Sequence, residues 1–134
     1  MHTPYDSRLF APLYGTDAMR AWWSDTALVQ SWLDVEVALA SAQAALGIIP
    51  EDAASAIADV AHIDNVDMDQ LAKKTAVVGM PIQPLISALS AQGGPLVQQY
   101  LHWGGTTQDV LDTGQALRLA GSLRLLDSEL RGLL

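Results

Sequence analysis

The sequence contains no cysteine and few cationic residues. Without cysteine, a protein can form no disulfide, no thiolate metal site and no thiol nucleophile. Seven Lys and Arg residues stand against 15 Asp and Glu residues, which gives a formal net charge of −8. Nucleic-acid backbones and anionic membrane surfaces are therefore poor partners.

Signals for membrane insertion or export are also absent. No apolar run approaches the roughly 18 residues of a membrane span. The amino-terminal segment MHTPYDSRLF lacks the basic stretch followed by an apolar run that marks a signal peptide. We therefore expect a soluble, cytoplasmic protein.

The 134 residues are 50% hydrophobic, which is enough for the core of one ordinary domain. Residues 1–15 contain Pro4, Pro12 and Gly15, and we expect them to form an extended arm. Beyond this arm the apolar residues recur at helical spacing, and no alternating runs rich in β-branched residues occur. The sequence therefore predicts an all-α fold without internal repeats.

Helix boundaries can be placed from capping residues. Ser24 and Asp25 can cap a helix that ends at Gly47. Its apolar positions advance by alternating steps of four and three residues: Leu28, Trp32, Val35, Leu39, Ala42 and Leu46. Further helices are predicted after Pro50, over residues 67–78, in PLISALSAQ and in LVQQYL.

The longest predicted helix runs from about Thr107 to the end of the sequence. One apolar series in it advances by steps of three and four, as in a coiled coil: Ala116, Leu119, Leu123, Leu126, Leu130 and Leu133. A second series widens this surface: Val110, Leu117, Leu125 and Leu134. We expect this helix to pack against several other helices, through oligomerisation or through further segments of chain.

The segment HWGGTTQDVLDTG, residues 102–114, precedes and opens that helix. Gly104 and Gly105 allow a ligand to approach the backbone, while Thr106, Thr107 and Gln108 offer side-chain donors. Together with the free amides of a helix start, these groups could bind an anion such as a carboxylate. The simpler alternative, which spacing alone favours, is that a threonine caps the helix and Asp109 complements its dipole.

Three histidines occur, and only His102 lies within a motif. It could position or protonate an anionic group, or it could be a turn residue that donates to a backbone carbonyl. We expect His2 and His62 to be surface residues. No cluster of histidines and carboxylates has metal-ligand spacing, so neither a metal nor a cofactor is expected.

The remaining polar and aromatic candidates have simpler explanations. Glu36 is expected to reach solvent at the edge of its helix, because carboxylates are seldom buried. The alternative is a partly buried carboxylate paired with an arginine or a backbone group. Asp112 would repel an anion unless it orients His102 or caps a neighbour. The four tryptophans are expected to anchor helix packing: Trp22, Trp23, Trp32 and Trp103.

HWGGTTQDVLDTG closely resembles the first signature of the fumarase/aspartase superfamily, in the form found in adenylosuccinate lyases and bacterial 3-carboxy-cis,cis-muconate cycloisomerases. The segment WSDTALVQSWLDVEVALASAQAALGIIPEDAASAI resembles the opening helices of the same branch. The residues of the motif resemble those of the cycloisomerases more than those of the adenylosuccinate lyases. Where adenylosuccinate lyases carry an Arg-His-Asp stretch, this sequence has Val78, Gly79 and Met80.

The resemblance implies roles for individual residues. Thr106, Thr107 and Gln108 match residues that hold a substrate carboxylate, and His102 matches a histidine lining the same pocket. The implied substrate is a small tricarboxylate, and the implied reaction is the intramolecular lactone formation of protocatechuate breakdown in the β-ketoadipate pathway. The implied enzyme is a homotetramer whose active sites combine segments of three subunits.

The resemblance also implies segments that do not occur in this sequence: a second signature bearing a histidine, and a Gly-Ser-Ser-Met-Pro loop whose serine is the general base of the lyases. We therefore expect residues 1–105 to be an amino-terminal helical domain and residues 106–134 the start of a central bundle. Such a chain would hold one corner of an active site and would be inactive alone. The alternatives are a piece of an adenylosuccinate lyase-like enzyme and a non-catalytic helical module that binds a partner helix.

Overall fold

The computed structural model describes residues 7–133, and within that range every regular element is a helix. This confirms the all-α prediction. The elements in chain order are α1 (Ala11–Tyr14), α2 (Asp17–Trp22), α3 (Asp25–Ala45), α4 (Glu51–Val60), the short 3-10 turn η2 (Ile63–Asn65), α5 (Met68–Val78), α6 (Ile82–Gln92), α7 (Gly94–Tyr100) and α8 (Thr107–Arg131).

The predicted capping residues define the helix boundaries. The Ser24 hydroxyl accepts the amide N–H of Ala27 at the start of α3, and the Asp67 carboxylate accepts that of Gln70 at the start of α5. Gly47 and Gly79 follow α3 and α5 with φ angles of 69° and 84°, a left-handed conformation that stops a helix. These boundaries are confirmed.

Residues 1–15 were predicted to form an extended arm, and this prediction is wrong for residues 11–14. These residues form α1, and Pro12 lies in its first turn. Proline is tolerated there because a backbone N–H in the first turn would have no partner within the helix. The Ser7 hydroxyl accepts the amide N–H groups of Leu9 and Phe10 ahead of this turn. Pro4 and the other residues of the 1–6 segment lie outside the described residues.

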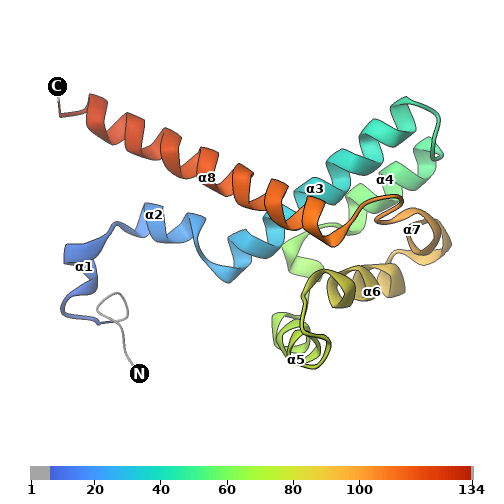
Figure 1. Cartoon of the computed structure of the whole chain (residues 1–134), viewed down its shortest axis with the longest axis horizontal. Helices are drawn as coiled ribbons and strands as arrows, with labels where there is room; N and C mark the ends of the chain where they lie inside the picture. Colours follow the sequence, from blue (N-terminus) through green and yellow to red (C-terminus); the bar gives the residue numbers. More distant parts are fainter. Residues whose placement is uncertain (1–6, 134) are drawn as a thin grey trace.

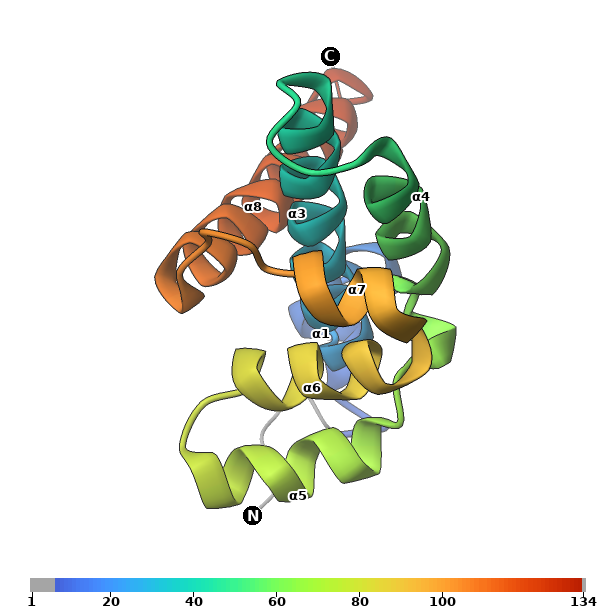
Figure 2. The ribbon, with the colours of Figure 1, turned by 90° about the vertical axis from the view of Figure 1, so that its right-hand side faces the viewer.

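Helix α3 lies at the centre of the molecule, with α4 and α8 packed against it (Figure 1). Helix α7 packs on α4, α6 on α7, and α5 on α6, so these helices follow one another away from α3 (Figure 2). The core contains large side chains that are almost fully buried: Leu33, Ile57, Ile82, Leu85, Leu89, Val97 and Val110.

The periodic apolar positions of α3 coincide only in part with its buried positions. Trp32 is buried, but Leu46 is 75% exposed, and the innermost positions include Val29 and Leu33. This helix carries apolar residues around most of its circumference. Periodicity alone therefore could not select its inner face.

Helix α8 packs through a face different from its leucine stripe. Its buried residues are Val110, Gly114, Arg118, Gly121 and Ser122. Leu119, Leu123 and Leu130 are between 47% and 61% exposed. The carboxyl-terminal half of α8 extends away from α4, α5, α6 and α7 and runs beside α2 (Figure 1). Residues 7–133 therefore do not provide the helical partners that were predicted for the leucine stripe.

None of the helices in residues 7–133 has the length and the apolar character that a membrane span requires.

Candidate carboxylate-binding site

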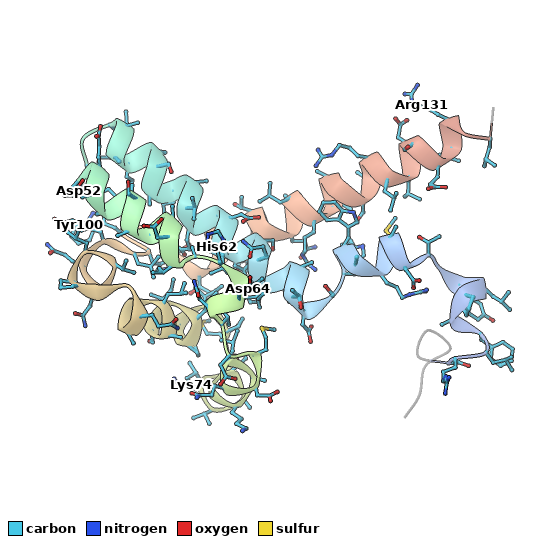
Figure 3. The ribbon with its side chains drawn as sticks, turned by 180° about the vertical axis from the view of Figure 1, so that it is seen from behind. Asp52, His62, Asp64, Lys74, Tyr100 and Arg131 are labelled. Carbon is cyan, nitrogen blue, oxygen red and sulfur yellow. The ribbon has the colours of Figure 1, made fainter. Side chains whose placement is uncertain are left out.

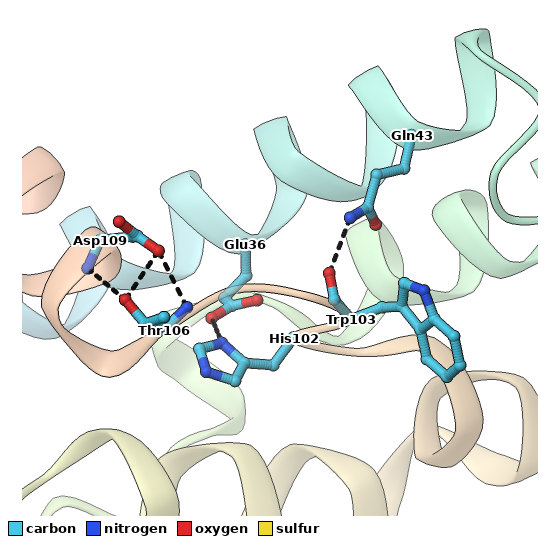
Figure 4. Close-up of polar contacts among 6 residues, drawn as sticks. All are labelled: Glu36, Gln43, His102, Trp103, Thr106 and Asp109. Carbon is cyan, nitrogen blue, oxygen red and sulfur yellow. Dashed lines mark hydrogen bonds and ion pairs between the residues drawn. The ribbon is translucent and has the colours of Figure 1, made fainter.

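The segment between α7 and α8 forms a tight turn that α3 supports. His102 has a φ angle of 62°, and it is the only residue other than glycine in the described range with positive φ. Gly104 has a φ of 68°. The carbonyl of Trp103 accepts a 2.7 Å hydrogen bond from the side-chain amide of Gln43 on α3 (Figure 4). A strained backbone at His102 is thus maintained by contacts from outside the turn.

Thr106 caps α8 with both of its hydrogen-bonding functions. Its hydroxyl accepts the Asp109 amide N–H at 3.2 Å and donates to the Asp109 carboxylate at 2.7 Å. The same carboxylate accepts the Thr106 amide N–H at 3.0 Å, which completes a capping box. These bonds lower the pKa of Asp109. The capping interpretation of Thr106 is therefore correct, and its hydroxyl proton is already used.

Thr107 and Gln108 leave donors free. Neither backbone amide has a hydrogen-bond partner among the described residues, as expected for the first turn of a helix. The partly buried Thr107 hydroxyl also has no such partner, whereas the Gln108 side-chain amide donates to the Asp112 carboxylate at 2.6 Å. Asp112 thus orients Gln108 rather than His102. The free donors that could bind an anion come mainly from Thr107.

The prediction that Glu36 reaches solvent is wrong. Its side chain is fully buried, and its Oε1 atom lies 2.6 Å from Nδ1 of His102 (Figure 4). Burial raises the pKa of Glu36, and the contacts with His102 act in the opposite direction. Sequence analysis missed the partner because 66 residues separate the two. Because the His102 side chain keeps 16% exposure, the histidine bridges a buried carboxylate and the surface of the turn.

The other histidines do not join this site. His62 is exposed, as predicted, and directly precedes η2, where it is labelled in Figure 3. His2 lies outside the described residues. Among residues 7–133, no group of three or more histidines or carboxylates could hold a metal ion.

The tryptophans anchor packing to different degrees. Trp32 is buried in the core, while Trp22 and Trp23 contact α8 and stay partly exposed. The guanidinium of Arg118 lies 4.9 Å from the ring centre of Trp23. The Trp103 ring is half exposed and packs against Tyr100 at a centroid distance of 6.0 Å.

A groove of about 400 Å³ lies between α3 and α8 beside this turn. Gly104 and Gly105 line one part of it, and its other walls are mostly apolar. Asp34 and Asp109 are its charged lining residues, and both carry negative charge. None of the four predicted carboxylate-binding residues lines this groove. The negative charges and apolar walls of this groove therefore make it unsuited to an anion.

The sequence and the fold of this chain are both similar to those of known enzymes. Trans-aconitate decarboxylase 1 of Mycosarcoma maydis is 37% identical over 118 residues, which cover 88% of this chain and 24% of that protein. The 3-carboxy-cis,cis-muconate cycloisomerase of Pseudomonas putida is 38% identical over 127 residues, or 92% of this chain and 30% of that protein. The crystal structure of the 3-carboxy-cis,cis-muconate lactonizing enzyme from Pseudomonas putida superposes with a TM-score of 0.86 at 37% identity, over 92% of this chain and 29% of that one.

These relatives and structural neighbours are members of the fumarase/aspartase superfamily. No family model matches the sequence, so the similarity to this superfamily depends on these relatives and on the shared fold. The chain spans less than a third of the length of the relatives named above. The part of the chain that the structure describes includes the HWGGTTQD turn, and it leaves the backbone amides of Thr107 and Gln108 at the start of α8 unpaired.

Proposed function

We propose that this chain is the amino-terminal part of a 3-carboxy-cis,cis-muconate cycloisomerase, an enzyme that converts an unsaturated tricarboxylate into a lactone. The observation that carries the proposal is the 38% identity to the Pseudomonas putida cycloisomerase across 92% of the chain. The turn at residues 102–108 supports it, because that turn presents unpaired donors suited to a carboxylate. In this proposal residues 1–105 are the amino-terminal domain and residues 106–134 begin a central helical bundle.

The proposed reaction needs donors directed at a carboxylate. A carboxylate oxygen of the substrate adds to a carbon–carbon double bond, and a proton is delivered to the neighbouring carbon, so the lactone is an isomer of the substrate. Negative charge develops on the carbon next to a second carboxylate and spreads onto its oxygens. Preorganised donors stabilise this charge more strongly than they stabilise the ground state.

The residues of this chain would bind and orient the substrate. The Thr107 hydroxyl and the amides of Thr107 and Gln108 would donate to one carboxylate, and the positive end of the α8 dipole would favour it. His102 would contact the same or an adjacent carboxylate. Thr106 would act through its capping box, which fixes the direction of the first helical turn. Other segments and other subunits of a homotetramer would supply the proton-transfer groups, so we expect no turnover by the 134-residue chain alone.

A second substrate is favoured by a specific observation. The Mycosarcoma maydis relative, whose name gives its substrate as trans-aconitate, is 37% identical to this chain. Trans-aconitate is also an unsaturated tricarboxylate, so the same donors could hold it. Decarboxylation would then replace lactone formation as the chemical step. Adenylosuccinate is a third candidate, although Val78, Gly79 and Met80 replace polar residues that such a lyase would use.

The test is a matched assay of the protein expressed from the complete reading frame that encodes this segment. It would be given 3-carboxy-cis,cis-muconate, trans-aconitate and adenylosuccinate under the same conditions. Loss of the conjugated-diene absorbance with appearance of the lactone is the expected result. Release of carbon dioxide from trans-aconitate, or fumarate from adenylosuccinate, without lactone formation would replace the proposed function.

A further inference from the structure

The carboxylate of Glu36 is a feature that the proposed reaction does not yet use. It lies in the middle of α3 with a fully buried side chain. Its Oε2 atom has no hydrogen-bond partner among the described residues, and the hydrogen-bond partner of Oε1 is His102. A carboxylate placed in a core with one partner is costly, and an apolar side chain of similar size would serve packing better. Packing alone therefore does not account for this residue.

The geometry restricts how the imidazole of His102 can bind other groups. Its Nδ1 atom faces Glu36 at 2.6 Å, and its second ring nitrogen points away from Glu36 (Figure 4). Gly105 lies beside the ring, since a Cβ atom there would be 3.4 Å from both Cε1 and Nδ1. The left-handed backbone of His102 also fixes where its side chain leaves the turn. The backbone conformation of His102, the neighbouring Gly105 and the contact between Nδ1 and Glu36 thus together restrict the orientation of the ring.

The charges around this imidazole come from two helices. Glu36 approaches it from α3, and Asp109 acts on it electrostatically from the first turn of α8. Asp109 is committed to the capping box with Thr106, so it makes no hydrogen bond to the ring. Glu36 is therefore the group that decides which ring nitrogen carries a proton.

We propose that Glu36 is a positioning residue for the carboxylate site: it accepts the Nδ1–H of His102 and thereby directs Nε2 toward the substrate. The proposal rests on the proposed function, because it assumes that His102 contacts a substrate carboxylate. When the ring takes up a second proton, Nε2–H becomes a donor to that carboxylate, and Glu36 balances the new positive charge. Without Glu36 the ring could place its single proton on Nε2 and turn Nδ1 toward solvent or the turn.

The first arm of the test reads the tautomer directly and needs no substrate. ¹⁵N chemical shifts of the imidazole nitrogens would be measured by two-bond correlation NMR on the 134-residue chain and on a Glu36→Leu variant. His62→Gln and His2→Gln variants, in which one set of imidazole signals disappears at a time, would assign the remaining signals to His102. We expect a protonated Nδ1 in the wild-type chain, in neutral and charged rings alike. In Glu36→Leu we expect the neutral ring to shift to the Nε2–H form.

The second arm measures kcat and KM of the protein from the complete reading frame on 3-carboxy-cis,cis-muconate. Glu36→Leu should lower kcat/KM by about tenfold or more, since an incorrectly oriented histidine loses its productive contact. Glu36→Gln, which retains an acceptor for Nδ1–H, should restore part of this loss. Asp34→Asn removes an exposed negative charge from the same helix and is the matched control. Helical circular dichroism would confirm that each variant is folded, and Glu36→Gln with the NMR arm serves if Glu36→Leu does not fold.

The outcomes separate the two proposals. An unprotonated Nδ1 in the wild-type neutral ring, or an unchanged tautomer in Glu36→Leu, overturns the positioning role. A changed tautomer with unchanged kcat/KM overturns it as well, because Glu36 would then be only structural. If the wild-type protein turns over none of the three substrates, the proposed function fails, and the role of Glu36 in it fails for that separate reason. A changed tautomer together with a reduced kcat/KM supports the proposal.

Discussion

At the scale of single residues, the two adjacent threonines of the motif have different environments. Thr106 uses its hydroxyl and its amide in hydrogen bonds with Asp109. Thr107 makes no side-chain hydrogen bond among the described residues and is only partly buried. From the sequence alone, the two threonines are equivalent donors. In the structure, Thr106 caps α8, and the hydroxyl of Thr107 stays available for a ligand.

Replacing the free threonine should affect the reaction directly. In the protein from the complete reading frame, Thr107→Ala should reduce kcat on the order of a hundredfold, because one donor to the developing charge is lost. Steady-state kinetics with 3-carboxy-cis,cis-muconate measure the effect. Thr113→Ala, an exposed threonine further along α8, is the control. Unchanged kinetics in Thr107→Ala would remove that residue from the proposed site.

The two carboxylates near His102 have pKa values that move in opposite directions. Burial raises the pKa of Glu36 above its ordinary value of 4.5. Hydrogen bonds from Thr106 lower the pKa of Asp109 below 3.8. A raised carboxylate pKa means that the folded protein binds more protons than the unfolded chain between the two values. Ionised Glu36 therefore costs stability as pH rises above 4.5, and ionised Asp109 contributes stability that disappears as pH falls below 3.8.

The pH dependence of unfolding should reveal the buried carboxylate. We expect the free energy of unfolding of the wild-type chain to decline relative to that of Glu36→Gln as pH rises above 4.5 toward the raised pKa. Urea denaturation at several pH values from about 4 to 7 would measure the difference. Asp34→Asn should parallel the wild type over this range. A difference between wild type and Glu36→Gln that is independent of pH would contradict the raised pKa.

At the scale of elements, small residues allow α8 to approach its neighbours. A Cβ atom at Gly114 would lie 2.8 Å from both Ser31 Oγ and Trp32 Cδ1 on α3. At Gly121 a Cβ atom would lie 2.3 Å from the Trp22 ring of α2. Ser31 and Trp32 are buried, whereas Trp22 is 37% exposed. The first contact is thus the more rigid, because a partly exposed ring can move aside.

The rigid contact predicts an overpacking effect. Gly114→Ala should lower the free energy of unfolding by about 1–3 kcal/mol through displaced side chains. This loss should exceed the gain of about 1 kcal/mol that alanine offers a helix over glycine. Chemical denaturation measures the change, with Gln115→Ala at an exposed position of α8 as the control. A Gly114→Ala chain at least as stable as the wild type would show that α3 and α8 can separate at little cost.

At the scale of the whole molecule, α8 carries a row of exposed leucines beyond the region where it contacts α3. Leu123, Leu126 and Leu130 are each about half exposed or more. Their spacing by three and four residues places them on one side of the helix. Such a continuous apolar surface is typical of a protein interface. The described residues bury a different face of α8 instead, which includes Gly114, Arg118 and Gly121.

The leucine row predicts association of the isolated chain. Sedimentation velocity should show oligomers whose population increases with protein concentration. Replacing Leu123, Leu126 and Leu130 together by glutamine should shift the distribution toward monomer, because the apolar contact is removed. Leu46→Gln, at a separate exposed position after α3, should leave the distribution unchanged. Equal association by both variants would exclude the α8 surface as its cause.

The sequence predicts the helices well because their signals are local. Ser24, Asp67, Gly47 and Gly79 determine boundaries through hydrogen bonds and φ angles within one helical turn. It predicts the buried faces less well. Apolar residues surround much of α3, and in α8 the leucines outnumber the glycines that make the contacts. Which face is buried depends on the neighbours available, and periodicity does not contain that information.

By itself, the sequence determined the all-α class, the helix boundaries at Ser24, Gly47, Asp67 and Gly79, and a motif that resembles a signature of the fumarase/aspartase superfamily, since each depends on residues close together in the chain. Only the tertiary structure decided the pairing of Glu36 with His102 and the different roles of Thr106 and Thr107. The first depends on two side chains 66 residues apart, and the second depends on where the Asp109 carboxylate folds back. A buried carboxylate is stable only beside a partner that the fold delivers, so its role cannot be deduced from its position in the sequence.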